Sequence, residues 1–186
     1  MYAYQKKMSE KDIKNIRMRL KMTQKEFAEI VNVTSKTVER WESGKSEVSG
    51  PITVLLKFLN EDPMAVDRLK VPDMDDYPMR LNYFKGDELC TSIDIDEVRR
   101  RIRIKNYTSD WLSCAFGRNE HPDFAAYETF LESRCFPRER DKMKLMLKEL
   151  NLPFYDPFMI VEKTGGRLEG DDYRIEIIRR KGNRGQ

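Results

Sequence analysis

The sequence predicts two folded parts, an all-α helical bundle followed by a small α+β domain. Apolar residues before residue 62 recur with the 3.6-residue period of helices, and an acidic segment with three prolines follows over residues 63–78. Beyond it, the alternation typical of strands is interspersed with segments of helical period. We therefore expect a helical domain over residues 1–62, a linker over 63–78, an α+β interaction domain over 79–178 and a disordered basic tail over 179–186.

The composition excludes several classes of protein. The chain has 186 residues and a formal net charge of +3, too small for a histone-like polycation, so any nucleic-acid contact must come from local clustering of charge. Residues 1–7 contain no apolar signal-peptide core, and no apolar run approaches the roughly 20 residues that cross a bilayer. Three cysteines without a C-x-x-C motif fit a reducing compartment. We expect a soluble cytoplasmic protein that makes no membrane contact.

Four helices are predicted in the first part. Apolar residues between Ile13 and Leu20 mark the first helix, and Thr23-Gln24-Lys25-Glu26 forms a capping box that starts the second. Thr34 or Ser35 caps the third, which stops at Ser43-Gly44. The fourth begins near Ser49-Gly50-Pro51, with proline at an N-terminal position. Four helices in so few residues make a compact bundle.

The second part is predicted to be a small sheet with helices packed on it. A hairpin turn at Lys85-Gly86-Asp87 joins the first two strands. The predicted strands cover Met79–Phe84, Glu88–Ile95, Val98–Ile104 and Tyr173–Ile177. The predicted helices cover residues 122–133 and 138–150, and a short one opens at Asp156-Pro157 and ends at Gly165-Gly166.

The most specific pattern in the chain is Thr23-Gln24-x-Glu26-Phe27-Ala28-x-x-Val31-x-Val33-x-x-x-Thr37-Val38-x-x-Trp41-Glu42-x-Gly44. Ala28 is small where two helices would cross, Val33 and Val38 fill the space between them, and Trp41 seals the third helix against the bundle. Over roughly residues 10–60 the pattern resembles the Cro/cI-like (XRE) helix-turn-helix family. The resemblance implies an all-α helix-turn-helix bundle that binds double-stranded DNA.

The resemblance also implies site residues. In this family the early residues of the third helix enter the major groove, so Ser35, Lys36 and Arg40 would face base edges. Lys36 or Arg40 could donate to guanine, and Arg40 could do so with two parallel hydrogen bonds. The predicted phosphate contacts are Gln24, Thr34, Ser43 and Lys45. The alternative is a helical bundle with a merely solvated charged face.

The second half carries a weaker resemblance. Ala115-Phe116-Gly117, the segment 130–138 and Tyr155-Asp156-Pro157-Phe158 are similar to a domain of uncharacterised Firmicutes proteins. Some of these are encoded beside HipA-like kinases of toxin–antitoxin modules. The resemblance implies a DNA-binding antitoxin or autoregulator whose second domain binds a partner protein.

Catalytic and metal sites are not favoured by the sequence. His121 is the single histidine, and its position just before a helix favours a capping or surface role. Together with Cys90, Cys114 and Cys135 it lacks the paired spacing of structural zinc sites. Asp94 and Asp96 would suit a hard cation on a strand face, but a solvated strand end is the favoured interpretation. We expect no catalytic residue, no metal and no cofactor.

Two basic runs remain, Arg99-Arg100-Arg101 with Arg103 and Lys105, and Arg179-Arg180-Lys181 with Arg184. Either could add phosphate contacts that do not depend on sequence. A solvated strand face and a solubilising tail are the favoured interpretation.

Together these patterns predict a sequence-specific double-stranded DNA-binding transcriptional regulator, a repressor or autoregulator that is not an enzyme. A homodimer on half-sites about 34 Å apart would supply the specific affinity. The first alternative is an antitoxin whose C-terminal domain binds and neutralises a toxin, with DNA binding secondary. The others are a DNA-tethered nuclease that uses Asp94 and Asp96, and a ligand sensor. The sequence leaves the operator and the dimerising segment open.

Overall fold

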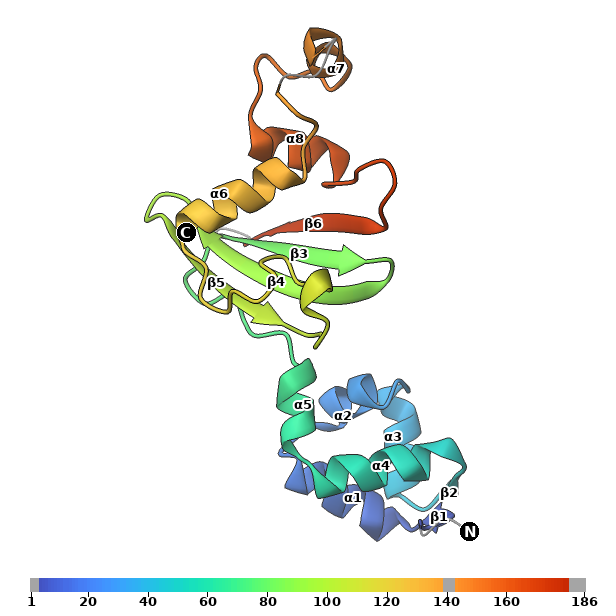
Figure 1. Cartoon of the computed structure of the whole chain (residues 1–186). Coiled ribbons are helices and arrows are strands. Elements are labelled where there is room, and N and C mark those ends of the chain that lie inside the picture. Colours follow the sequence, from blue (N-terminus) through green and yellow to red (C-terminus); the bar gives the residue numbers. More distant parts are fainter. Residues whose placement is uncertain (1–3, 139–142, 181–186) are drawn as a thin grey trace, which may run out of the picture. The chain divides into compact units, whose positions relative to one another are not determined.

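The computed structural model describes residues 4–138 and 143–180. Its internal contacts divide the chain into two compact units, Met1–Lys70 and Val71–Gln186 (Figure 1). The first is the predicted helical bundle and the second the predicted α+β domain, so the expected fold class is confirmed.

Over residues 4–70 the N-terminal unit consists of five helices and a short ribbon. The helices are α1 (Glu10–Arg19), α2 (Gln24–Ile30), α3 (Ser35–Glu42), α4 (Pro51–Glu61) and α5 (Met64–Leu69). Thr23 and Glu26 form the predicted capping box of α2, and Thr34, rather than Ser35, caps α3. The ribbon was not predicted: β1 (Lys7–Met8) pairs antiparallel with β2 (Val48–Ser49). Two residues a strand are too few to show an alternation in sequence.

The core of this unit follows the predicted motif. Phe27 and Val38 are fully buried, and Ala28, almost fully buried, belongs to the same hydrophobic cluster. Trp41 is 9% exposed and closes α3 against the bundle, while Val33 is half-buried at its edge. The apolar positions therefore hold α3 by one face.

The boundary between the units differs from the predicted linker. Residues 64–69 form α5, and Val66 is buried in the N-terminal core, so the division falls between Lys70 and Val71. Pro63 stands at the N-cap of this helix, where its missing N–H costs nothing. The proline was therefore a helix start and not a linker signal.

An ion pair joins α1 to α3. Nε and Nη2 of Arg17 donate to the two carboxylate oxygens of Glu42 at 2.6 and 3.1 Å, and Nε2 of Gln24 on α2 donates to the same carboxylate at 2.8 Å. The side chains of Arg17 and Glu42 are only 12% and 8% exposed. Three helices thus meet at one largely buried charge.

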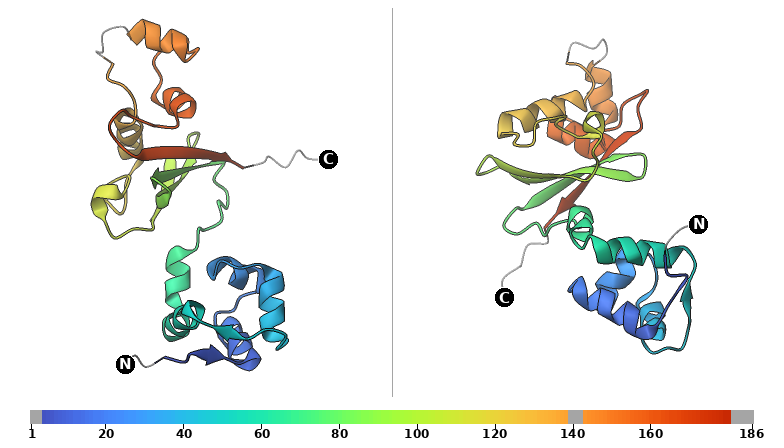
Figure 2. Two further views of the ribbon diagram at one scale, coloured as in Figure 1. Left: turned by 90° about the vertical axis from the view of Figure 1, so that its right-hand side faces the viewer. Right: turned by 60° about the horizontal axis from the view of Figure 1, so that its bottom comes forward.

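In its described residues the C-terminal unit is a four-stranded antiparallel sheet with helices on one face. The strand order is β5 (Arg101–Asn106), β4 (Glu88–Asp96), β3 (Met79–Lys85) and β6 (Tyr173–Arg179). Helices α6 (Phe124–Ser133) and α8 (Pro157–Thr164) lie over the same face in every view, and α7 (Met143–Glu149) stands between them in the chain (Figures 1 and 2). Leu81, Ile93 and Ile95 point into the core beneath the helices. The predicted hairpin turn at residues 85–87 joins β3 to β4.

The four strands each end one or two residues later than predicted, two predicted element starts were wrong, and two predictions lie partly outside the described residues. The third strand begins at Arg101 and not at Val98, because Asp96 accepts a hydrogen bond from the backbone N–H of Arg99 and turns the chain. Helix α6 begins at Phe124, after its N-cap residue Asp123. Of the helix predicted over 138–150, residues 139–142 lie outside the described part, as do residues 181–186 of the basic tail. Arg179 is the last residue of β6.

A buried ion cluster occupies the sheet face opposite the helices. Arg80, Asp94 and Arg103 are cross-strand neighbours on β3, β4 and β5. Arg80 donates two hydrogen bonds to Asp94, at 2.5 and 3.0 Å, and Arg103 donates at 2.6 and 3.0 Å. Asp94 is 2% exposed. The carboxylate of Asp94 therefore has a structural role, which is to join the three strands.

Replacing Asp94 should destabilise the sheet strongly, because removal of one partner leaves buried guanidinium charge uncompensated. We expect Asp94→Ala to lower the free energy of unfolding of this unit by about 3–5 kcal/mol. Urea unfolding followed by the fluorescence of Trp111, in a Trp41→Phe background, measures this change. Glu88→Ala, at an exposed position of β4, is the control; equal losses in both variants would contradict the role of the cluster.

The Glu42 pair should make the N-terminal unit sensitive to acid. Burial raises the pKa of Glu42, but the hydrogen bonds from Arg17 and Gln24 outweigh it, so the pKa lies below the ordinary value of 4.5. The stabilisation is therefore complete above that value and is lost as the pH falls through the lower, folded-state pKa.

Glu42→Gln removes this contribution, so the stability difference from the unmodified protein should be largest at about pH 7 and shrink by about pH 3. Unfolding followed by Trp41 fluorescence, in a Trp111→Phe background, measures it at each pH. Comparison at each pH cancels the contributions of Asp12 and Glu26, whose capping hydrogen bonds also lower their pKa values. A difference that does not change with pH would contradict the pair's role.

Candidate nucleic-acid interface

The outer face of α3 presents two cations that no other described side chain contacts. Val38 and Trp41 bury the inner face of the helix, which leaves Lys36, Glu39 and Arg40 exposed. Within the described part of the chain, neither Lys36 nor Arg40 has a side-chain ion pair or hydrogen bond. They are four residues apart and so lie on the same side of the helix. This pair can approach a nucleic acid without breaking an internal contact.

The start of α3 offers backbone donors for an anion. The hydroxyl of Thr34 accepts a hydrogen bond from the N–H of Thr37 at 3.2 Å and lies 2.9 Å from the hydroxyl of Thr37. The first N–H groups of a helix have no intrahelical acceptor, so those of Ser35 and Lys36 suit a phosphate oxygen. Ser35 itself is half-buried. Thr34 therefore shapes the helix terminus, and its predicted phosphate contact stays a prediction.

The other predicted phosphate contacts have unequal freedom. Lys45 is exposed beyond the end of α3, and its side chain has no partner in the described ranges. The hydroxyl of Ser43 donates to the carbonyl of Arg40 at 3.2 Å, so a phosphate would have to replace that bond. Gln24 is half-buried and donates to Glu42 at 2.8 Å. Among these three residues, Lys45 is the one already free to meet a phosphate.

Arg17 and Glu42 have a role that sequence reasoning missed. Glu42 is part of the quoted motif, yet its partner lies 25 residues earlier in the chain. Helical period and capping patterns report contacts within one turn, so they cannot connect such residues. The one hint in the sequence was that the motif contains an acid, Glu42, to which no role had been assigned.

The arginines of β5 are engaged by acids of the same unit. Nη1 of Arg103 donates to Asp75 at 2.5 Å, and its Nη2 also donates to the carbonyl of Asp73. Arg101 pairs with Asp76 and Asp96. These contacts add to the buried cluster, and so the basic run is neither a simple solvated face nor a free phosphate-binding surface.

An aromatic ring completes this arrangement. The ring of Tyr77 lies 4.7 Å from the guanidinium of Arg101 and 5.1 Å from that of Arg103, within cation–π range. The acidic segment 73–77 therefore packs along β5. Half of the predicted linker is part of the sheet domain.

The alternative chemistries find little support in the geometry. Asp94 and Asp96 face guanidinium groups rather than an open site. Cys90 and Cys135 are buried, and burial raises the pKa of the Cys135 thiol to about 12. No cluster of three or more metal-binding side chains occurs within residues 4–138 and 143–180. In the same ranges no helix has the length and apolar character needed to cross a membrane.

Comparisons with known proteins bear on the N-terminal unit. Residues 13–54 match the family described as Helix-turn-helix. The protein named Antitoxin HigA-2, from Vibrio cholerae serotype O1 (strain ATCC 39315 / El Tor Inaba N16961), is 31% identical over 62 residues. That match covers 33% of this chain and 60% of the relative, so the chain spans about three-fifths of the relative's length.

The matched segment runs from within α1 to the start of α4 and contains α2 and α3 whole. The predicted XRE-type resemblance is thereby confirmed for this part of the chain, whereas the resemblance proposed for the second half stays a prediction. The N-terminal unit of this chain therefore carries a helix-turn-helix domain of the XRE type.

Proposed function

We propose that this protein is a sequence-specific double-stranded DNA-binding regulator of transcription, acting as a homodimer that represses its target promoter. The observation that carries the proposal is the unpaired Lys36–Arg40 face of α3 in a helix-turn-helix domain. Arg101 and Arg103 of β5, by contrast, are already paired with acids of their own unit. Such a function needs no catalytic residue and no cofactor, and it belongs in the cytoplasm.

The geometry suggests how the domain would read DNA. Helix α3 would enter the major groove, with Arg40 donating two hydrogen bonds to a guanine and Lys36 and Ser35 near neighbouring bases. The bond network of Glu42 holds α3 to α1 and α2, so the recognition side chains would meet the groove with little loss of conformational entropy. A dimer bound across a promoter would then exclude polymerase.

Selection of bound fragments from the source genome tests this proposal. Full-length protein at about physiological salt should enrich two-fold symmetric sites with half-sites about 10 base pairs apart. A Lys36→Ala/Arg40→Ala double variant is the control. Enrichment of the same sites by the double variant, or no enrichment by the unmodified protein, would contradict DNA reading by α3.

A second candidate function is that of an antitoxin that neutralises a partner protein through its C-terminal unit. The similarity to a protein named as an antitoxin favours it. A partner should then be retained from a nuclease-treated lysate of the source organism equally by the unmodified protein and by the double variant. Loss of the partner upon nuclease treatment would instead indicate association through DNA.

Arg40→Ala should weaken specific binding by about 1–3 kcal/mol and relax the preference at one base pair, because a base-edge contact discriminates between bases. Affinities for the selected site and for single-base variants of it measure both effects. Lys163→Ala, at an exposed position of α8, is the charge-matched control. An equal loss of affinity for every duplex would indicate that Arg40 contacts phosphate and not a base.

Lys45→Ala should weaken binding to all duplexes alike, because a phosphate contact carries no base information. The slope of log affinity against log salt concentration should fall in magnitude by about one. Titrations of a specific and an unrelated duplex at several salt concentrations measure it. A loss confined to the specific duplex would assign Lys45 to base reading.

A further inference from the structure

The C-terminal unit contains a cavity that the DNA-binding function does not use. Its volume is about 580 Å³, within the range of small-molecule sites. It lies between α6, the start of α8 and the turn that joins β4 to β5. The residues that line it and carry the argument are Glu97, Phe124, Tyr127, Asp156 and Phe158.

The other charged residues that line the cavity form ion pairs with one another. Arg100 pairs with Glu128 at 3.1 Å, and Arg138 pairs with Glu132 at 2.6 Å. The nearby Arg179, at the end of β6, pairs with Glu162. The cations around the cavity are thus already neutralised.

Two carboxylates are left over. The side chain of Glu97 has no hydrogen bond or ion pair with any described residue, whereas its backbone carbonyl accepts from the N–H of Arg100 at 3.3 Å. Asp156 caps α8 by accepting from the N–H of Met159 with one oxygen, at 2.8 Å, and no described residue donates to its other oxygen. Both carboxylates line the cavity, and burial together with the charge of Asp156 raises the pKa of Glu97 against the opposing effect of Arg179. The cavity therefore has an excess of negative charge.

Tyr127 gives a second, independent indication that the cavity binds a ligand. The residue is 1% exposed, and its buried hydroxyl has no hydrogen-bond partner among the described residues. Tyr127 lines the cavity together with Glu97, Glu128 and Asp156, and burial, reinforced by the charges of these acids, raises the pKa of its hydroxyl. A buried hydroxyl without a partner costs stability that a bound donor would restore.

The aromatic rings at the cavity already lie against cations of the protein itself. The Phe124 ring lies 4.4 Å from the guanidinium of Arg100, and the Phe158 ring lies 6.0 Å from that of Arg179. Both rings therefore already face cations. The faces of aromatic rings attract positive charge, and this attraction is strongest where water is excluded.

We propose that this cavity binds an organic cation, an alkylammonium or guanidinium group that lies between Glu97 and Asp156 and donates a hydrogen bond to the hydroxyl oxygen of Tyr127. Such a group neutralises the two unpaired carboxylates and supplies the missing partner of the hydroxyl. It comes either from a free amine or guanidine or from a lysine or arginine of another polypeptide. The site is independent of α3 and of DNA binding.

Calorimetric titration of the full-length protein tests the proposal with two matched pairs of probes. Butylguanidinium and butylurea differ in charge and hardly in shape, and so do the capped peptides Gly-Arg-Gly and Gly-citrulline-Gly. We expect saturable binding of at least one cationic probe and none of the uncharged ones. Tighter binding of the arginine peptide than of butylguanidinium assigns the site to a polypeptide side chain, and the reverse order assigns it to a free cation.

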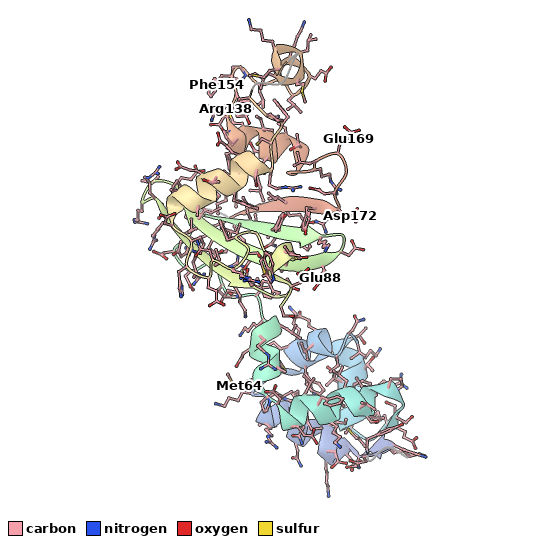
Figure 3. All side chains as sticks on the ribbon, in the orientation of Figure 1. Met64, Glu88, Arg138, Phe154, Glu169 and Asp172 are labelled. Carbon is pink, nitrogen blue, oxygen red and sulfur yellow. The ribbon has the colours of Figure 1, made fainter. Side chains whose placement is uncertain are left out.

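Three variants locate the binding within the cavity. Glu97→Gln and Tyr127→Phe should each lower the affinity about tenfold, the loss expected for one charge-assisted or buried hydrogen bond. Tyr127→Phe should keep or raise the melting temperature, because it removes only the unpartnered hydroxyl, so a binding defect is not a folding defect. Glu88→Gln, at the β3–β4 hairpin and remote from Arg138 of the cavity, should bind like the unmodified protein (Figure 3).

Three results would overturn the proposal. The first is the absence of saturable binding by both cationic probes. The second is equal binding of the uncharged probes, which would mean that charge is not recognised. The third is unchanged affinity in both Glu97→Gln and Tyr127→Phe, which would place the bound cation elsewhere.

Discussion

The carboxylate of Glu42 accepts hydrogen bonds from Arg17 on α1 and from Gln24 on α2, so that three helices meet at one largely buried charge. Breaking such a pair leaves an uncompensated buried charge, which costs far more than a surface ion pair gains. The position of α3 depends on this contact, because its own apolar face is limited to a few residues such as Val38 and Trp41. A helix that must present side chains to a groove needs this kind of support.

The same physical rule decides which basic residues of the chain are available. Arg101 and Arg103 on β5 resemble a nucleic-acid-binding stripe in sequence, but acids of β4 and of the segment 73–77 neutralise them. Lys36 and Arg40 form a smaller group, yet no side chain in the described part of the protein competes for them. Availability, rather than the number of cations, therefore distinguishes the candidate DNA-binding face.

In the cavity beside α6 and α8 it is acidic groups, and not cations, that have no partner among the described residues. There the cations are paired, and two carboxylates and the hydroxyl of Tyr127 have unused hydrogen-bonding capacity. In both places the residues without partners, and not the most highly charged segments, indicate where another molecule fits. A partner or a small cation bound at the second site would be recognised by chemistry quite different from that of DNA.

Local structure could be predicted from the sequence: the capping box at Thr23, the apolar faces of α2 and α3, and the hairpin at Gly86. These features depend on neighbours within a few residues, and such contacts leave a periodic or positional pattern in the chain. The tertiary structure alone decided that Pro63 opens α5, that Arg17 meets Glu42 and that Asp75 covers Arg103. Each of these pairings joins groups whose meeting depends on how the elements pack, and an ion pair between distant residues has no period to reveal it.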